Sequence, residues 1–242
     1  MNLNVLYEDN HLIAVYKPSG VLTQGDETCD VSMMDEVKKY LKEKYRKPGN
    51  VFLGLLHRLD RPVSGIVLFS KTSKGASRLS EQFRNHTVEK KYHAIALGRP
   101  KADRGELINY MGKDRESKRA IIYKTEVEER CRPSSSSAFS QSENLIKEGS
   151  QKAELSYEVV ALNDKYCLLL IQPRTGRFHQ IRAQLSFAGF PVLGDLKYGA
   201  PSPLPDRSIA LSATYLSFKL ATKNERREIS VPIPAGWDKY VK

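Results

Sequence analysis

The sequence lacks the features that mark secreted, membrane or metal-dependent proteins. Its three cysteines are widely spaced and form no CxxC pair, so a disulfide framework or thiolate zinc site is not expected. Its five histidines show no HExxH or comparable spacing. No apolar run approaches the roughly 18 residues that a membrane span requires, and the first ten residues lack the regions of a secretory signal. We therefore expect a soluble, cytoplasmic protein without a metal site.

Positive charge, in contrast, is in excess. The 242 residues contain 39 Lys and Arg against 28 Asp and Glu, which gives a net charge of +11 and a pI of about 9.5. This excess is typical of proteins that bind a polyanion, most often nucleic acid, but it also serves solubility alone. Hydrophobic residues make up 40% of a chain long enough to bury one sizeable core. We expect one domain over residues 1–242.

Short apolar runs predict a chain made mostly of strands. Strands are expected at residues 5–7, 12–16, 51–56, 66–69, 91–97, 120–127, 155–162, 166–172, 209–211, 215–218 and 228–231, and helices at 33–41, 73–83 and 178–188. Because few helices separate the strands, we predict an α+β fold with a mixed, mainly antiparallel central sheet flanked by a few helices. The Ser-rich residues 133–151 predict a mobile surface loop inserted between two strands.

The first of two dense motifs is HRLDRPVSG at residues 57–65. It places the carboxylate of Asp60 between Arg58 and Arg61 in a tight turn before a strand. Nearby guanidinium groups favour an ionised carboxylate, which can act as a nucleophile or as a general base. Taken alone, the motif fits a surface ion-pair cluster equally well.

The second motif is TGRFHQIR at residues 175–182. Gly176 permits a sharp turn, and the helix that follows directs its positive N-terminal end toward that turn. Arg177 and Arg182 are able to bind phosphate there, or one of them pairs with a carboxylate elsewhere in the fold. A helix with solvated arginines explains this segment equally well when it is taken alone.

Together, the two motifs resemble the RluA family of RNA pseudouridine synthases. The resemblance is carried by HRLDRPVSG, TGRFHQIRAQLSFAGFPVLGDLKYG, YEDNHLIAVYKPSGVLT and VEKKYHAIALG, which occur in the family's order between about residues 5 and 199. It implies the pseudouridine synthase fold and an isomerase that detaches uracil from its ribose in RNA, rotates it and rejoins it through carbon. The reaction is redox-neutral, so no cofactor is expected. The implied substrates are specific uridines of ribosomal or transfer RNA, and we expect a monomer without a protein partner.

The resemblance also implies catalytic roles for three residues. Asp60 would attack the anomeric carbon of the ribose or help to form a glycal intermediate, and these two routes stay open. Tyr92, which forms a K-x-Y element with Lys90, would stack on the uracil and take part in removing its C5 proton. Arg182 would pair with Asp60 and hold it charged and oriented.

Further residues are expected to bind the substrate. A stacked base is unreachable until its nucleotide is flipped out, and His57 and Arg58 would fill the space left behind or contact phosphates. Ile181 or Leu185 would pack against the base or the tyrosine. The predicted substrate- and RNA-binding residues are His57, Arg58, Arg61, Lys90, Arg177, Ile181 and Leu185. The basic residues Lys113, Arg115, Lys118 and Arg119 fit either RNA contact or a solvated charge run.

Three positions depart from the family pattern. Val63 stands where the family often has Thr, and Gln184 and Ser212 stand where it often has His. The family's frequent S4-like RNA-binding domain is not expected, because the catalytic pattern begins within the first ten residues, so RNA would be held by the basic surface of the catalytic domain. The alternative to an enzyme is a catalytically silent RNA-binding protein on the same scaffold. A glycoside hydrolase is disfavoured, because no second acidic residue is evident for the site.

Overall fold

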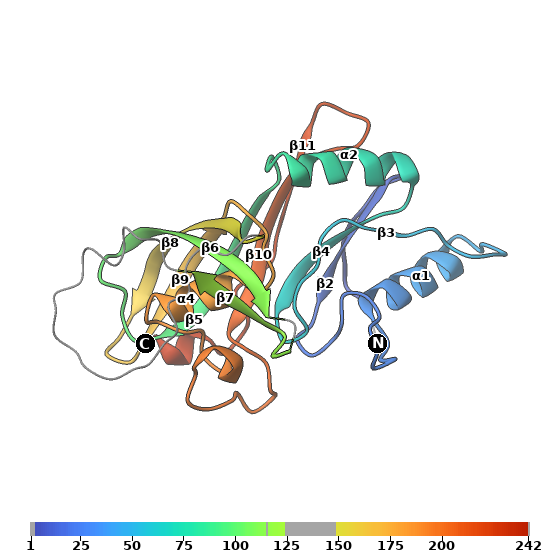
Figure 1. Cartoon of the computed structure of the whole chain (residues 1–242). Helices are drawn as coiled ribbons and strands as arrows, with labels where there is room; N and C mark the ends of the chain where they lie inside the picture. The colour runs from blue at the N-terminus through green and yellow to red at the C-terminus, as the bar shows by residue number, and fades with distance from the viewer. Residues whose placement is uncertain (1–2, 115, 124–148, 242) are drawn as a thin grey trace.

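The computed structural model describes residues 3–114, 116–123 and 149–241 of the chain and shows one large sheet with helices packed against it (Figure 1). The strands are β1 (Val5–Glu8), β2 (Leu12–Lys17), β3 (Gly54–Leu55), β4 (Ser64–Ser70), β5 (Glu89–Leu97), β6 (Arg104–Asp114), β7 (Arg119–Tyr123), β8 (Gln151–Leu162), β9 (Tyr166–Pro173), β10 (Leu211–Lys219) and β11 (Arg226–Ser230). The helices are α1 (Met33–Lys44), α2 (Ser73–Arg84) and α4 (Gln180–Phe187), with short 3-10 helices η1 (Leu196–Tyr198) and η2 (Asp238–Tyr240).

The sheet has the order β1-β2-β4-β10-β5-β9-β8-β6-β7, with β3 paired to β4 and β11 paired to β10. Among the described strands, β4 and β10 form a parallel pair and the other pairs are antiparallel. This arrangement confirms the predicted α+β class with a mixed, mainly antiparallel sheet.

Strands β2 and β4 are buried on both faces, which explains why their sequences read as continuous apolar runs. On one face, Ile13 and Phe69 pack in a cluster with Val37 of α1. On the other face, Leu12 packs in a cluster with Leu79 of α2. Burying a side chain of this size stabilises a fold by roughly 1.5–3 kcal/mol. The two helices therefore hold the central strands between them, and this fixes the turn that precedes β4.

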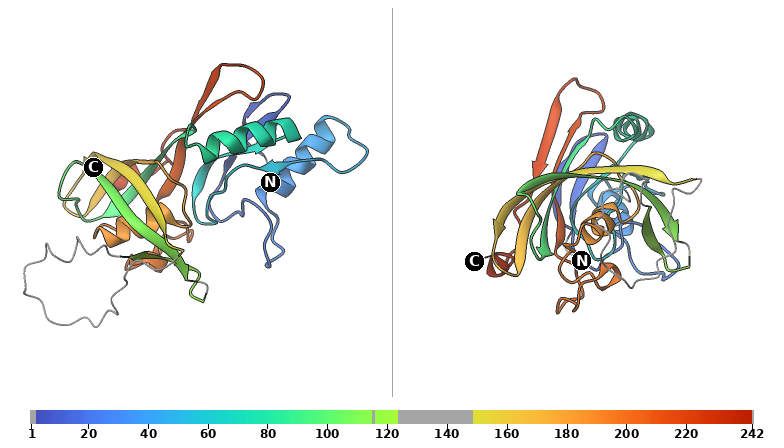
Figure 2. Two further views of the ribbon diagram at one scale, coloured as in Figure 1. Left: turned by 45° about the horizontal axis from the view of Figure 1, so that its top comes forward. Right: turned by 60° about the vertical axis from the view of Figure 1, so that its left-hand side comes forward.

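The remaining strands curve around helix α4. In the right-hand view of Figure 2, β6 and β8 arch over this helix. Gln184 of α4 is fully buried, and its Nε2 donates to the carbonyl oxygens of Leu107 on β6 at 3.0 Å and Ala153 on β8 at 3.3 Å. The same nitrogen donates to Oδ1 of Asn109 at 2.8 Å. A residue that departs from the family pattern thus anchors α4 to the sheet.

Three predicted strands differ from the structure. β3 is limited to Gly54–Leu55 within the predicted residues 51–56. Of the strand expected at 209–211 only Leu211 is in a strand, and it begins β10, which also contains the strand expected at 215–218. The register of β10 against β5 shifts between Ala213 and Tyr215, which interrupts the apolar pattern. Strand β6 is not predicted, because charged residues stand at both of its ends and its burial does not follow its polarity: Ile108 is exposed while Asn109 is buried.

Some predicted features fall outside the described residues. The Ser-rich segment 133–151 lies almost entirely outside them, as do Arg115, Cys131 and residues 124–127 of an expected strand. Of the helices in the described ranges, none has the length and apolar character needed to cross a membrane.

Candidate functional site

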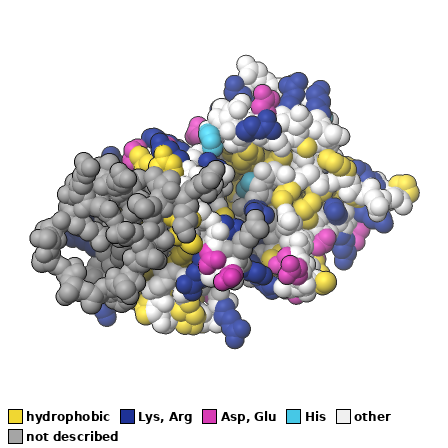
Figure 3. All heavy atoms as spheres, in the orientation of Figure 1, with side chains coloured by type: hydrophobic (Ala, Val, Ile, Leu, Met, Phe, Trp, Pro, Cys, Tyr) yellow, Lys and Arg dark blue, Asp and Glu magenta, His cyan; other side chains and the backbone are white. Residues whose placement is uncertain are grey.

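A pocket of about 670 Å³ lies where the turn before β4, the end of α2, strand β5 and the turn before α4 meet. This volume falls within the roughly 300–1,000 Å³ of small-molecule sites. Figure 3 shows a hollow in the middle of the face drawn, with Lys and Arg side chains on both sides of it. Among the described residues that line the pocket, Asp60 is the sole carboxylate.

The turn that carries Asp60 is held by its neighbours. The buried Leu59 exchanges two hydrogen bonds with the Thr23 hydroxyl, which donates to the Leu59 carbonyl at 2.8 Å and accepts from its N–H at 3.1 Å. Gly65 follows with a φ of 122°, and a Cβ there would lie 2.3 Å from the carbonyl oxygen of Ala213 on β10. The motif therefore needs glycine at this position so that β4 and β10 can approach each other.

Lys17 also holds the turn that carries Asp60. Its side chain is fully buried, and Nζ donates to the carbonyl oxygens of Pro18, Val21 and Arg61 at 3.0, 2.7 and 3.1 Å. Burial lowers the pKa of Lys17 to about 7, while the charge of Asp60 opposes this shift. Lys17 is not among the residues predicted from the sequence, although a lysine at the end of an apolar strand, directly before Pro-x-Gly, is a usable signal.

Arg182 is shared between two carboxylates. Its Nη1 donates to Oδ2 of Asp60 at 3.0 Å, while Nε and Nη2 form a fork to the two oxygens of Asp195 at 2.7 and 2.8 Å. Burial acts to lower the pKa of Arg182, but hydrogen bonds and charges from Asp195 and Asp60 outweigh it, so the pKa is raised. The structure thus brings the predicted pair into contact, and it adds Asp195, which the sequence analysis does not predict as a site residue.

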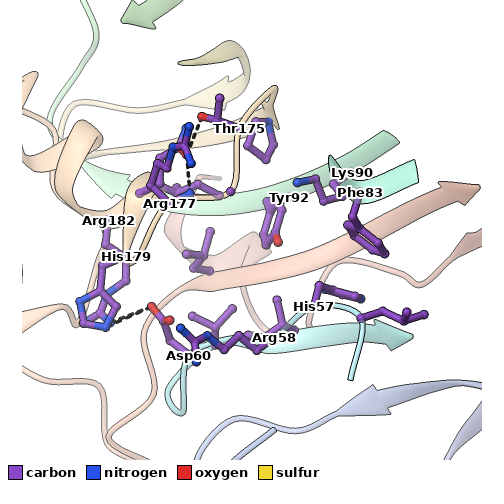
Figure 4. A pocket seen from close by; sticks show the side chains of 18 of the residues that line it. His57, Arg58, Asp60, Phe83, Lys90, Tyr92, Thr175, Arg177, His179 and Arg182 are labelled. Atoms are coloured by element: carbon purple, nitrogen blue, oxygen red, sulfur yellow. Dashed lines mark hydrogen bonds and ion pairs between the residues drawn. The ribbon is translucent and has the colours of Figure 1, made fainter. Parts of the chain in front are cut away.

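His179 approaches Asp60 from the start of α4, as the dashed line in Figure 4 shows. Nε2 of His179 lies 3.6 Å from Oδ2 of Asp60, and its Nδ1 lies 2.9 Å from the Tyr198 hydroxyl. His179 has a φ of 50°, which is uncommon for a residue other than glycine and occurs often at functional sites. Both His179 and Tyr198 stand in the segment TGRFHQIRAQLSFAGFPVLGDLKYG that carries the family resemblance, but neither is a predicted site residue.

Tyr92 and Lys90 project from β5 into the pocket (Figure 4). Burial raises the pKa of Tyr92, and the negative charge of Asp60 raises it further, so its phenol keeps the proton at neutral pH. Burial lowers the pKa of Lys90. The Lys90 amine makes no hydrogen bond or ion pair to any residue that the structure describes, so it is available to a ligand.

His57 closes the other side of the pocket. Its ring stacks on Phe83 with centroids 5.0 Å apart, and its Nε2 accepts a hydrogen bond from the backbone N–H of Leu68 at 3.0 Å. Burial and the charge of Lys90 lower the pKa of His57 to about 3. His57 is therefore a neutral residue, and accepting at Nε2 places its proton on Nδ1.

Most of the predicted site residues converge on the pocket, but two do not. The predicted residues that line it are His57, Arg58, Asp60, Lys90, Tyr92, Arg177, Ile181 and Arg182. Leu185 is fully buried in the core, so of the two alternatives Ile181 is the one that faces the pocket. Arg61 points away and pairs with Asp30 at 2.7 Å. The cation in contact with Asp60 is Arg182, so the expectation that Arg61 helps to hold the Asp60 charge is wrong, while that for Arg58, which lines the pocket, stays a prediction.

The hairpin formed by β6 and β7 adds basic side chains next to α4. Lys113 lies over the ring of Phe178 at 4.7 Å, and the Lys197 amine donates to the carbonyl oxygen of Lys118 at 3.1 Å. Lys118 and Arg119 are exposed. The predicted charge run therefore adjoins the side of the pocket that carries His179.

Known proteins resemble this chain in sequence and in fold. Residues 11–187 match the family model described as RNA pseudouridylate synthase. Ribosomal large subunit pseudouridine synthase C of Rickettsia prowazekii is 32% identical over 232 residues, which cover 94% of this chain and 68% of that protein. tRNA pseudouridine synthase C of Haemophilus ducreyi is 34% identical over 202 residues, covering 82% and 75%. The structure of human RNA pseudouridylate synthase domain containing 4 superposes with a TM-score of 0.74 at 23% identity, covering 96% of this chain and 89% of that one.

Proposed function

Because the chain belongs to the RNA pseudouridylate synthase family, it is an isomerase that acts on RNA, and we propose that it converts specific uridines of ribosomal or transfer RNA to pseudouridine in the pocket around Asp60. One observation carries the assignment of the site. The single carboxylate among the described lining residues stands at the pocket wall in contact with Arg182, which is itself fixed by Asp195.

The proposed substrate is a uridine turned out of its RNA stack, because neither face of a stacked base is accessible. Apolar side chains of Val63, Ile181 and Leu211 offer it a surface, and Tyr92 offers a ring for stacking. The unpaired amine of Lys90 faces the same space and would bind a carbonyl oxygen of uracil or a phosphate beside it. The basic lining and the basic hairpin beside it suit the RNA backbone.

In the proposed route, a carboxylate oxygen of Asp60 bonds to C1′ of the ribose while the C1′–N1 bond breaks and its electron pair leaves with N1. The uracil then turns in the pocket, C5 bonds to C1′, and the carboxylate departs with the electrons of the ester bond. The C5 proton is lost and N1 takes up a proton. Atoms and electrons therefore balance without an oxidant, a reductant or a second substrate.

Arg182 would keep Asp60 ionised and aimed before the attack. Two of its donors are committed to Asp195, so the guanidinium is held in place, and an N–H of Nη1 donates to Asp60. Such preorganised donors lower the cost of reorganisation during the reaction. Asp195 thus acts on the chemistry through the position of Arg182.

Tyr92 would stack on the base, give its phenol proton to N1 once N1 has left C1′, and then accept the C5 proton as a phenolate. Its raised pKa has burial as the larger cause and the charge of Asp60 as the second. Formation of the ester at Asp60 removes that charge, so the phenol becomes a stronger acid in the intermediate than in the free protein. This ordering keeps Tyr92 protonated while the substrate binds and lets it exchange a proton after N1 has left.

The two routes that the sequence leaves open differ in one bond. Attack at C1′ leaves the C2′–H bond intact, whereas formation of a glycal requires Asp60 to remove the C2′ proton. RNA deuterated at C2′ of the target uridine distinguishes the two routes. Attack at C1′ predicts no primary isotope effect on the rate of a single turnover. A several-fold slower turnover would contradict attack at C1′ and support the glycal route.

The function is tested by incubating the purified chain with transcripts of ribosomal and transfer RNA and mapping pseudouridine at single-nucleotide resolution. We expect conversion at one or a few positions of one RNA class. If the protein binds RNA but converts neither the transcripts nor native RNA that lacks pseudouridine, the result would contradict the proposed activity and favour the catalytically silent RNA-binding alternative. Asp60→Asn is the matched control, because it keeps the size of the side chain and should retain RNA binding while losing conversion.

A further inference from the structure

The two oxygens of the Asp60 carboxylate differ in their surroundings. Oδ2 faces Nη1 of Arg182 at 3.0 Å and Nε2 of His179 at 3.6 Å. Oδ1 has no hydrogen bond or ion pair with any part of the chain that the structure describes. A distance of 3.6 Å exceeds that of a hydrogen bond, as catalytic contacts often do before the substrate binds. The carboxylate is thus held from one side, which leaves one oxygen for a reaction.

The proton on His179 can be located from its neighbours. The backbone N–H of Ala120 donates to the Tyr198 hydroxyl oxygen at 2.7 Å, so the hydroxyl proton is free to be donated to Nδ1 of His179 at 2.9 Å. Burial raises the pKa of Tyr198, which keeps that proton in place. When Nδ1 accepts, the proton of the neutral imidazole lies on Nε2. Nε2–H then points toward Oδ2 of Asp60.

The orientation of the imidazole ring is also fixed. It stacks on Phe178 with centroids 3.8 Å apart and meets the ring of Tyr198 edge-on at 5.6 Å. The guanidinium of Arg182 lies 5.0 Å from the centre of the same tyrosine ring. His179 adopts its left-handed backbone conformation at the N-terminal end of α4. Tyr198 therefore supports both of the groups that contact Oδ2.

The surroundings of His179 keep it neutral. The titratable and charged groups that face it are Asp60, Tyr198, Asp195, Arg182 and Lys197. Burial is the largest effect and lowers the pKa of His179 to about 4, while the charge of Asp60 opposes this and that of Arg182 adds to it. At neutral pH the ring is thus a dipolar donor to Asp60 and not a second cation.

We propose that His179 is a positioning residue for the reaction: as the Nε2–H tautomer fixed by Tyr198, it holds Oδ2 of Asp60 together with Arg182 and leaves Oδ1 as the oxygen that bonds to C1′. This inference rests on the proposed function. It adds to the proposed chemistry a residue pair, His179 and Tyr198, that links the reacting carboxylate to the backbone of β7 at Ala120.

A pair of substitutions at His179 tests which nitrogen matters. His179→Gln can place its amide N–H where Nε2 stands, whereas His179→Asn is shorter and reaches only the position of Nδ1. Asn also tolerates the left-handed backbone of residue 179. We expect His179→Asn to lower kcat about 10- to 100-fold with KM for the RNA nearly unchanged, because one donor to the carboxylate is lost. His179→Gln should recover most of that loss.

Tyr198→Phe gives a second measurement that does not change the histidine. It keeps the ring against Arg182 and removes the hydroxyl that fixes the tautomer, so we expect kcat to fall about 5- to 10-fold. Since a donor to a carboxylate favours its ionised form, the acidic limb of the kcat/KM profile should move to higher pH in both Tyr198→Phe and His179→Asn. A loss of packing alone would lower the amount of folded protein and leave the limb unmoved.

The outcomes separate the proposals. Parent protein that forms no pseudouridine would refute the proposed function itself. If the parent is active, three results would each overturn the role of His179. The first is a parental rate in His179→Asn, and the second is an equal loss of rate in His179→Asn and His179→Gln. The third is a parental rate and pH profile in Tyr198→Phe. A crystal structure with the target RNA bound should place Oδ1 nearest C1′, and Oδ2 in that position would overturn the assignment of the oxygen.

Discussion

Two ionic clusters in this chain are built from the same kinds of groups and differ in how completely they satisfy a carboxylate. In the Glu8 cluster (Glu8, Tyr40, Lys44, Tyr45 and Lys71), each oxygen of Glu8 has two partners. Oε1 accepts from Lys71 at 2.5 Å and Tyr45 at 2.7 Å, and Oε2 accepts from Lys44 at 2.7 Å and Tyr40 at 3.1 Å. In the Asp60 cluster (Asp60, His179, Arg182, Asp195 and Tyr198), only Oδ2 of Asp60 has partners among the described residues.

The difference indicates what each cluster does. The Glu8 cluster joins β1, α1 and the end of β4, and its carboxylate has no capacity left for a ligand. The Asp60 cluster satisfies its inner carboxylate, Asp195, with the fork of Arg182 and leaves the outer one half satisfied at a pocket. Charge density alone does not separate a structural cluster from a reactive one, whereas an unsatisfied oxygen at a cavity does.

Arg182→Ala should lower both the activity and the stability, because Arg182 contacts both the reacting carboxylate of Asp60 and the buried carboxylate of Asp195. We expect a loss of pseudouridine formation of at least ~100-fold, since Asp60 loses the cation that orients it. We also expect the free energy of unfolding to fall by about 3–5 kcal/mol, because the buried carboxylate of Asp195 loses its ion pair with Arg182. Single-turnover assays and urea denaturation measure the two effects.

Arg182→Lys serves as the matched control for that substitution. It keeps the positive charge but cannot form the fork to Asp195, so its activity should lie between those of the parent and Arg182→Ala. Parental activity in Arg182→Ala would show that the ion pair with Asp60 has no part in the reaction.

Glu8→Gln should break the structural cluster and leave the reactive one intact. We expect a loss of roughly 2 kcal/mol in the free energy of unfolding, because the ammonium of Lys71 loses its buried counter-charge. The contribution of Lys44 is smaller, since that side chain is 44% exposed and solvent screens it. Activity per folded molecule should stay at the parental value; a large drop in kcat would mean that the two clusters are coupled.

The pH dependence of stability gives the smallest and most specific effect. Burial acts to raise the pKa of Glu8, but hydrogen bonds from Lys44, Lys71 and Tyr45 outweigh it and lower the pKa to about 2, from an ordinary value of 4.5. A lowered acid pKa stabilises the fold above the unfolded-state value, and this contribution is lost as pH falls from about 4.5 toward 2.

Urea denaturation at several pH values checks this prediction. The parent should lose roughly 2 kcal/mol more stability than Glu8→Gln between pH 5 and pH 2.5. Equal slopes in the two proteins would show that Glu8 is not the group that titrates.

The parts of the fold that could be predicted from the sequence are those whose pattern is set by local burial. Strands β2 and β4 are covered on both faces by α1 and α2, so their apolar runs are unambiguous. Strand β6 is half exposed, and its sequence carries no such signal, because Asn109 is buried while Ile108 is exposed. Strand β10 contains a register shift that splits its pattern in two.

Site residues could be predicted from the sequence when they stand in a family motif to which a role is attached. Contacts between segments that are distant in the chain depend on the fold and could not be read from local sequence. Asp60, Tyr92 and Arg182 could be predicted as site residues because each stands in a segment that resembles the family. The partner of Asp60 comes from a helix far along the chain, whereas its sequence neighbour Arg61 turns outward to Asp30. The contacts of His179 and Lys17 likewise depend on tertiary packing, so neither is a predicted site residue, although each lies in a segment that carries the family resemblance.

The most direct test of the contrast between the two clusters is to measure single-turnover pseudouridine formation for Asp60→Asn and Glu8→Gln on the same target RNA, with urea denaturation of both. Asp60→Asn should lose at least ~1,000-fold in rate while its free energy of unfolding and its RNA affinity stay near the parental values. Glu8→Gln should show the reverse, with lower stability and the parental rate. Pseudouridine formation at the parental rate in Asp60→Asn would contradict the assignment of Asp60 as the reacting group.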